Sequence, residues 1–125
     1  MSELDFTREM LIALGARHDV RVWRQNVGSI PVRDRRGRVT RVFHAGPPVG
    51  ASDISGIVAP EGWRLEVELK MPGGKRSKAQ TVWANVIARM GGVYVLYTFD
   101  NAKDGAANLV AAVSRVTAEI DARRA

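Results

Sequence analysis

The chain contains no cysteine and only two histidines among its 125 residues. Without thiols, disulfide bonds, zinc sites with cysteine ligands and a cysteine nucleophile are all excluded. His18 and His44 are too few for a metal site built from several imidazoles. The lack of cysteine fits the reducing environment of the cytoplasm, which is the location that we expect.

Long apolar runs are also lacking. No stretch approaches the roughly 20 apolar residues that a membrane-spanning helix requires. No phosphate-binding sequence of the form Gly-x-x-x-x-Gly-Lys-Ser/Thr occurs, so neither ATP-driven activity nor a nucleotide cofactor is expected. What is present is an ordinary globular composition with 46% hydrophobic residues, and the length suits a single domain spanning residues 1–125.

The charge balance favours a polyanionic partner. Lysine and arginine total 19 against 13 acidic residues, which gives a formal net charge of +6. Arginines crowd between positions 33 and 41, and a second basic group follows at positions 75–78. Planar guanidinium groups suit contacts with phosphates, although a solvated charged loop would also explain either group.

Hydrophobic periodicity predicts an α/β fold class in which helices flank a central mixed sheet. The arginine group falls at the tip of a predicted hairpin whose strands are joined across residues 34–37. The predicted helices span residues 2–15, 77–90 and 106–122, and the predicted strands span residues 20–24, 30–33, 38–43, 53–58, 63–70 and 93–99.

The strand predicted at 63–70 has one apolar and one charged face, because successive strand side chains point to opposite sides. Its charged face carries Glu68 and Lys70, about 7 Å apart along the strand. Asp53, on the neighbouring predicted strand, can supply a second carboxylate. Two oxygen ligands beside a lysine suit Mg²⁺ and a phosphodiester. A solvated charged face would show the same alternation, so the Glu-x-Lys pair alone has little specificity.

Other short blocks accompany this pair along the chain. They are Glu3, Trp23-Arg24-Gln25-Asn26 with Gly28, residues 50–56, Glu66-Val67-Glu68-Leu69-Lys70, Ser77-Lys78-Ala79-Gln80 with Trp83, and residues 91–93. In this order the blocks resemble the PD-(D/E)xK nuclease superfamily, and within it the VRR-NUC family of virus-type replication and repair nucleases. The resemblance runs from Glu3 to Phe99 and implies a restriction-endonuclease-like core.

The resemblance also implies catalytic residues that use Mg²⁺ or Mn²⁺. Asp53 and Glu68 would hold the ion, with the backbone carbonyl of Leu69 as a third ligand. Lys70 would orient or deprotonate the attacking water. Glu3 would bind a second ion or its water, and Gln80 would hydrogen-bond near the site.

Some of these assignments have competing interpretations. The leading acidic position of the family falls on Glu3 or on Glu9, which lie about 240° apart around a helix. We favour Glu3, because it precedes the first apolar turn by the family's usual interval. Gln80 either hydrogen-bonds near the site or forms a capping box with Ser77, and we weight these two interpretations equally. For Glu66 we favour a surface charge over support of the site.

The implied function is that of a Mg²⁺-dependent endodeoxyribonuclease acting in DNA repair on branched DNA, similar to the Holliday-junction resolvases of phages and bacteria. We therefore expect it in the cytoplasm of a bacterial or phage-infected host cell. The residues expected to contact DNA are Arg24, Asn26, Arg33, Arg35, Arg36, Arg38, Arg41, Lys75, Arg76 and Lys78.

One chain offers one site, whereas resolving a four-way junction requires two cuts, so we expect a homodimer. Small residues of the last predicted helix either form the contact between subunits or belong to the core. They are Ala107, Val110, Ala111 and Val113.

Other functions compete with this one. A non-catalytic nucleic-acid-binding module would keep the arginines but have no use for Asp53, Glu68 and Lys70 together. A general DNA nickase would share the chemistry without the preference for branches. A restriction-type nuclease would need added elements that read base edges, for which the chain has little room.

Overall fold

The computed structural model describes residues 2–25, 28–45, 47–48 and 50–125. Its elements follow the predicted order of a helix, a strand, a hairpin, two strands, a helix, a strand and a helix. Their bounds are α1 Glu3–Gly15, β1 Val20–Arg24, β2 Gly28–Arg33, β3 Val39–Ala45, β4 Ile54–Val58, β5 Trp63–Lys70, α2 Lys78–Arg89, β6 Val93–Thr98 and α3 Gly105–Arg124.

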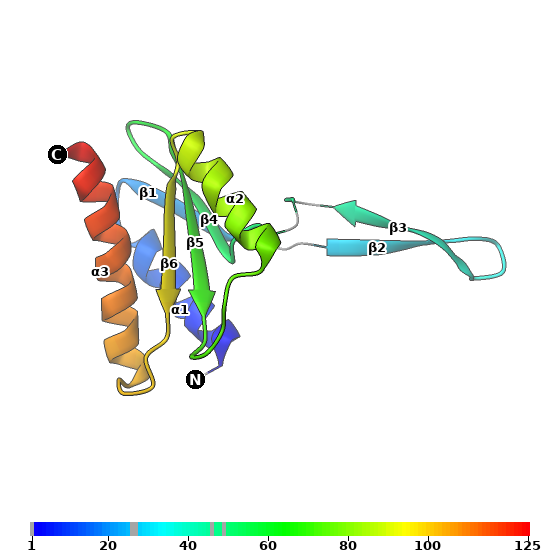
Figure 1. Ribbon diagram of the computed structural model, residues 1–125, viewed down its shortest axis with the longest axis horizontal. Coiled ribbons are helices and arrows are strands. Elements are labelled where there is room, and N and C mark those ends of the chain that lie inside the picture. The colour runs from blue at the N-terminus through cyan, green and yellow to red at the C-terminus, as the bar shows by residue number, and fades with distance from the viewer. Residues whose placement is uncertain (1, 26–27, 46, 49) are drawn as a thin grey trace.

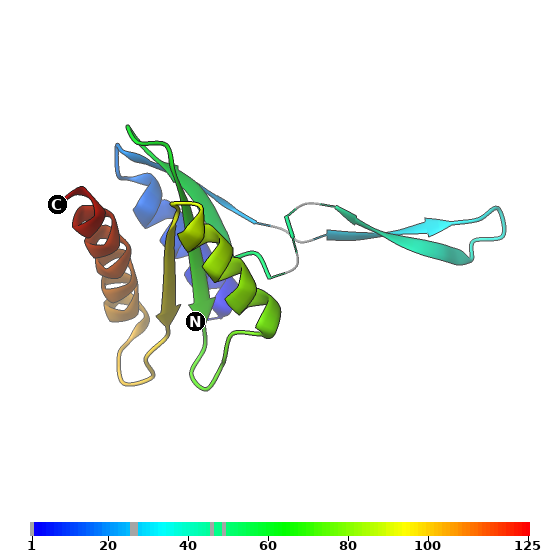
Figure 2. The same cartoon turned by 45° about the horizontal axis from the view of Figure 1, so that its top comes forward.

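A four-stranded sheet with the order β1-β4-β5-β6 forms the centre of the molecule. The β1–β4 and β4–β5 pairs are antiparallel and the β5–β6 pair is parallel, so the sheet is mixed. Helices α1 and α3 cover one face of this sheet, and α2 lies over the other (Figures 1 and 2). The predicted α/β class with a central mixed sheet flanked by helices is therefore confirmed.

The core lies between α1, α3 and one face of the sheet. Phe6, Met10 and Leu14 recur every four residues and form one buried stripe along α1. Phe6 stacks on Tyr97 of β6 with ring centroids 6.0 Å apart. The apolar side chains of β5 complete this core, as the alternation at 63–70 predicted. The charged face of the same strand therefore points toward α2.

Two boundaries differ from the prediction in ways that affect the site. Strand β4 begins at Ile54 rather than Asp53, because its last ladder pair with β5 joins Ile54 to Val67. Asp53 comes just before the first residue of β4 and lies beyond this last pair. Its carbonyl still accepts a hydrogen bond from the Gln25 N–H at 2.9 Å. Its side chain is thereby available for contacts beyond the ladder.

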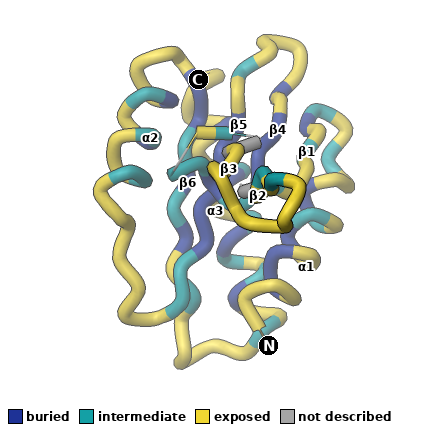
Figure 3. The backbone as a smooth tube through the Cα atoms, turned by 90° about the vertical axis from the view of Figure 1, so that its right-hand side faces the viewer, coloured by how far each residue is buried: buried dark blue, intermediate teal, exposed yellow. Residues whose placement is uncertain are grey.

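Strands β2 and β3 form a separate two-stranded sheet, which extends away from the rest of the chain as a ribbon (Figures 1 and 2). The predicted hairpin is confirmed, including its arginine-rich tip. The Asp34 carboxylate shapes the turn by accepting hydrogen bonds from the N–H groups of Arg36 and Arg38. Gly37 adopts a φ of 78°, a conformation that glycine tolerates best. The exposed tip contrasts with the buried strands of the main sheet (Figure 3).

Helix α3 packs on α1 and β6, and it bears on the expected subunit contact. Its buried side chains are Asn108, Ala112, Val116 and Ile120. Of the small residues proposed for a dimer contact, Ala107 and Val110 are exposed, whereas Ala111 and Val113 pack partly against the core. No helix within the described part of the chain is long and apolar enough to cross a membrane.

Candidate active site

The site predicted from the sequence lies where β5 runs past the end of β4. Because the β4–β5 ladder stops at the pair of Ile54 and Val67, the peptide of Leu69 has no strand partner on that side. The Asp53 carboxylate takes this place, since its Oδ2 accepts a hydrogen bond from the Leu69 N–H at 2.9 Å. The N–H and C=O of one strand residue point to the same side, so the Leu69 carbonyl also faces toward Asp53.

Glu68 is the buried acid at the centre of the site, with 2% of its surface exposed. Its Oε1 accepts a hydrogen bond from Nε2 of Gln80 at 3.2 Å and lies 4.0 Å from Nζ of Lys70. Its Oε2 is buried and has no hydrogen-bond partner among the described residues. A buried carboxylate oxygen without a partner is costly, so Glu68 has the capacity to accept one more proton or cation.

The raised pKa of Glu68 also indicates that its carboxylate lacks a compensating positive charge. Burial, followed by the nearby Asp53 carboxylate, raises the pKa of Glu68 to about 8, and the ammonium of Lys70 only partly opposes this rise. Two carboxylates in a poorly solvated site cannot both ionise readily without a positive charge between them. A divalent cation would supply that charge.

The donor set fits Mg²⁺ or Mn²⁺. Asp53 and Glu68 offer carboxylate oxygens and Leu69 offers its carbonyl, and hard cations of this kind prefer oxygen ligands. Within the described ranges no group of three or more histidine or acidic side chains has metal-binding geometry. Mg²⁺ is commonly held by one or two carboxylates, with water and substrate phosphates completing its shell, so the two acids suffice.

Glu3 and Asp53 line the same pocket, which has a volume of about 250 Å³. Glu3 reaches it from the first turn of α1, which Ser2 caps by accepting a hydrogen bond from the Asp5 N–H. Arg24 at the end of β1 also lines this pocket. Glu9 is exposed on the same helix and does not line the pocket, so the geometry favours Glu3 over Glu9.

Gln80 both forms the capping box with Ser77 and hydrogen-bonds to Glu68, the two contacts between which the sequence could not decide. Its Oε1 accepts a hydrogen bond from the Ser77 N–H at 2.8 Å, and Ser77 Oγ accepts one from the Gln80 N–H, which completes a capping box. Its Nε2 donates to Glu68 at 3.2 Å. The capping box therefore holds the amide in the orientation that reaches the carboxylate.

The favoured interpretation of Glu66 as a surface charge is wrong. Glu66 is fully buried on the face of β5 that α2 covers. Its Oε1 accepts a hydrogen bond from Nε of Arg64 at 3.0 Å, while its Oε2 has no partner in the described part of the chain. The sequence pattern could not reveal this burial, because it does not show which helix covers the charged face of the strand.

Sequence reasoning missed two hydroxyl groups beside these acids. Ser52 is buried and Tyr94 is partly buried. Neither hydroxyl has a hydrogen-bond partner among the described residues. Burial raises the pKa of Tyr94, and the guanidinium of Arg76 lies 5.7 Å from the centre of its ring. The available signals were the place of Ser52 next to Asp53 and a tyrosine that interrupts an apolar strand.

The residues expected to contact DNA occupy separate parts of the surface. Arg24 borders the pocket of Asp53, and a second exposed group follows β5, in the loop that leads to α2 and at the start of that helix. The arginine-rich tip of the ribbon lies far from both (Figure 1). Asn26 lies outside the described residues. The second group comprises Lys75, Arg76 and Lys78, and the ribbon carries Arg33, Arg35, Arg36, Arg38 and Arg41.

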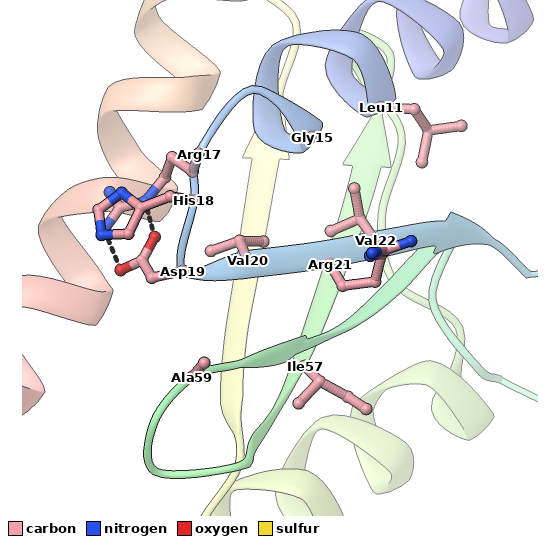
Figure 4. A pocket seen from close by; sticks show the side chains of 10 residues that line it. All are labelled: Leu11, Gly15, Arg17, His18, Asp19, Val20, Arg21, Val22, Ile57 and Ala59. Carbon is pink, nitrogen blue, oxygen red and sulfur yellow. Dashed lines mark hydrogen bonds and ion pairs between the residues drawn. The ribbon is translucent and has the colours of Figure 1, made fainter.

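A different hollow of about 590 Å³ lies beside β1 (Figure 4). Two of its charged side chains pair with each other, because Arg17 donates two hydrogen bonds to the Asp19 carboxylate, at 2.8 and 2.9 Å. Those bonds and a further one from Arg124 hold the pKa of Asp19 well below its usual range. This hollow thus contains an acid that is already paired, unlike Glu68, whose Oε2 has no partner among the described residues.

No protein-family model matches this chain, and no curated protein matches it.

Proposed function

We propose that this protein is a Mg²⁺-dependent endodeoxyribonuclease with a restriction-endonuclease-like core of the VRR-NUC type. The observation that carries the proposal is the unpartnered Oε2 of buried Glu68, close to the Asp53 carboxylate and with Lys70 on the same strand face. Acidic side chains that can hold a metal ion, with a lysine beside them, suit the metal-assisted hydrolysis of a phosphodiester.

The metal ion would be held by Asp53, Glu68 and the carbonyl of Leu69, where it would lower the pKa of a bound water and stabilise charge on the phosphate. Lys70, with its Nζ 4.0 Å from Oε1 of Glu68, would orient that water or take up its proton. Gln80 would hold the Glu68 carboxylate in place through its 3.2 Å hydrogen bond. Glu3, across the shared pocket from Asp53, would bind a second ion or a water.

The substrate in this proposal is DNA, and branched DNA is favoured. The chain has a formal charge of +6, and its arginine-rich ribbon can hold phosphates away from the site of cleavage. Cutting two strands of a four-way junction would require two such sites, so the proposal includes a homodimer. A cytoplasmic role in DNA repair would follow from this activity.

The test is a cleavage assay with Mg²⁺ on linear, nicked, flapped and four-way DNA. Asp53→Asn, Glu68→Gln and Lys70→Ala should each lower the cleavage rate by at least about 100-fold, because each removes a metal ligand or the proton-handling amine. Glu9→Gln is the matched control, since this acid lies on α1 outside the pocket and its loss should leave the rate unchanged.

DNA binding without cleavage under any divalent metal would instead identify a non-catalytic binding module. Equal cutting of linear duplex and four-way DNA would favour a general nickase. Undiminished cleavage by Glu68→Gln would remove the proposed site altogether.

A further inference from the structure

The free-standing ribbon of β2 and β3 carries an exposed pair of large apolar side chains. Ile30 and Phe43 lie opposite each other in the ladder, so their side chains share one face of the ribbon. Their exposed fractions are 56% and 55%, which is far more than a side chain with a structural role in the core would show. This pair forms a small apolar surface on the ribbon, away from the four-stranded sheet and its helices.

The opposite face of the ribbon is also apolar and uncovered. Val42 lies opposite Pro31, and its exposed fraction is 49%. In Figures 1 and 2 no other described part of the chain covers either face. A two-stranded ribbon on its own is only marginally stable in water, so a partner that covers these exposed apolar side chains would stabilise it.

Charge decides which partner this surface fits. Between positions 33 and 41 the ribbon carries five arginines and one aspartate, Asp34, which is itself paired with Arg38 at 3.1 Å. The side chains of Arg35 and Arg36 make no ion pair with the described residues and project at the tip. Bringing two such tips together in a pair of chains would place like charges in contact, whereas a polyanion complements them.

We propose that the ribbon is a DNA-binding arm in which Ile30 and Phe43 pack against unstacked bases while the tip arginines hold the flanking phosphates. A two-stranded ribbon is narrow enough to enter the major groove, and apolar side chains on such elements pack against or separate base steps. Bases at a branch or in a single strand offer exposed faces, whereas those of a duplex are already stacked. The arm would therefore direct the enzyme to branched DNA, and in this respect the inference rests on the proposed function.

The experiment compares DNA binding by the full chain and its variants in EDTA, where no metal-dependent cleavage occurs. The probes are a four-way junction, a single strand and a linear duplex, each labelled for fluorescence anisotropy. The double variant Ile30→Ala/Phe43→Ala should bind the junction and the single strand about tenfold more weakly, because stacking on bases is lost. Its affinity for the duplex should change by less than about twofold, since the arginines still hold phosphates.

Two controls isolate the apolar pair. Met90→Ala removes a side chain with a 77% exposed fraction from the end of α2, and it should leave all three affinities unchanged. A 2-aminopurine base placed at the branch should change its fluorescence when the wild-type chain binds, and this change should be absent with the double variant. Circular dichroism checks that the double variant is folded.

Equal weakening on the duplex and the junction would overturn the inference, because the ribbon would then contact only the backbone. Unchanged affinities of the double variant for all three probes would also overturn the inference. If the double variant at the same time sedimented as a monomer where the wild type is a dimer, the ribbon would be a contact between two copies. Failure of the proposed function is distinguishable. A chain that never cleaves DNA but shows the predicted binding pattern keeps the arm, whereas a chain that cleaves but shows no such pattern loses only the arm.

Discussion

At the scale of single residues, Glu68 has the most informative environment in the protein. Its carboxyl is buried beside Asp53, and its pKa is raised to about 8. Without a metal ion, folded chains retain a proton on Glu68 between pH 4.5 and about 8, whereas unfolded chains have lost it. The unfolded state therefore binds fewer protons in this window, so this group lowers the stability of the fold as pH rises.

Glu68→Gln should remove this pH dependence, because glutamine resembles the protonated acid. In EDTA we expect the variant and the wild type to have similar free energies of unfolding only below pH 4.5, and the wild type should lose stability relative to the variant as the pH rises from there to about 8. Between pH 6 and pH 9 the stability of the variant relative to the wild type should grow by about 2 kcal/mol. Urea unfolding at both pH values checks this. A wild type that is equally stable relative to the variant at both values would show that Glu68 is not buried as an unpaired acid.

Much of the site could be predicted at this scale, and the reason is the two-residue period of β5. That period placed Glu68 and Lys70 on one face, and the structure brings Asp53 beside them. The burial of Glu66 could not be predicted, because alternation identifies two faces without showing that α2 covers one of them. The catalytic roles of these residues stay predictions.

At the scale of elements, Asn108 connects the end of β6 to the start of α3. It is fully buried, and its Oδ1 accepts hydrogen bonds from the Tyr97 hydroxyl at 2.7 Å and the Asp100 N–H at 2.8 Å. Its Nδ2 donates to the carbonyls of Asp100, Lys103 and Asp104. One amide thus binds several backbone groups of this turn and the hydroxyl of Tyr97.

Asn108→Leu should destabilise the fold by about 2–4 kcal/mol, because it leaves several buried polar groups without partners while nearly preserving volume. Asn85→Leu provides the control, since this asparagine is exposed on α2 and its replacement should cost no more than about 0.5 kcal/mol. Urea denaturation measures both. Equal stability of the two variants would contradict the structural role assigned to Asn108.

The elements themselves were predictable because each carries a strong local signal. The capping box at Ser77 and the apolar repeat after it fixed the start of α2 to within one residue. The last helix begins at Gly105, capped by Asp104, and runs to Arg124, further than its apolar residues alone indicated. Its final turn is held by long-range hydrogen bonds from Arg124 to Glu61 and Asp19, which no local pattern contains.

At the scale of the whole molecule, the charge on the ribbon should govern the salt dependence of DNA binding. Replacing Arg35, Arg36 and Arg41 by alanine should lower the slope of log affinity against log salt by about 0.9 per lost phosphate contact. Arg38 should contribute less than these three, because Asp34 already pairs with it. Arg115→Ala, on the exposed side of α3, is the control and should leave the slope unchanged.

A slope for the triple variant that equals that of the wild type would show that the ribbon does not contact phosphates. The sequence predicted the hairpin and its arginine tip but not its position away from the main sheet. That position depends on which strands pair across the whole chain, and the ladder of β2 with β3 leaves both outside the four-stranded sheet. Sequence separation and turn signals carry no information on this choice.

The most direct measurement locates the metal on the polypeptide itself. Fe²⁺ substituted for Mg²⁺, with ascorbate and peroxide, produces short-lived radicals that cut the backbone next to the bound ion, and mass spectrometry identifies the cuts. We predict cuts near Asp53 and between Val67 and Lys70, suppressed by excess Mg²⁺ and absent in Glu68→Gln. Cuts confined to other segments, such as the one around Arg17 and Asp19, or cuts that persist unchanged in Glu68→Gln, would contradict a metal site at Asp53 and Glu68.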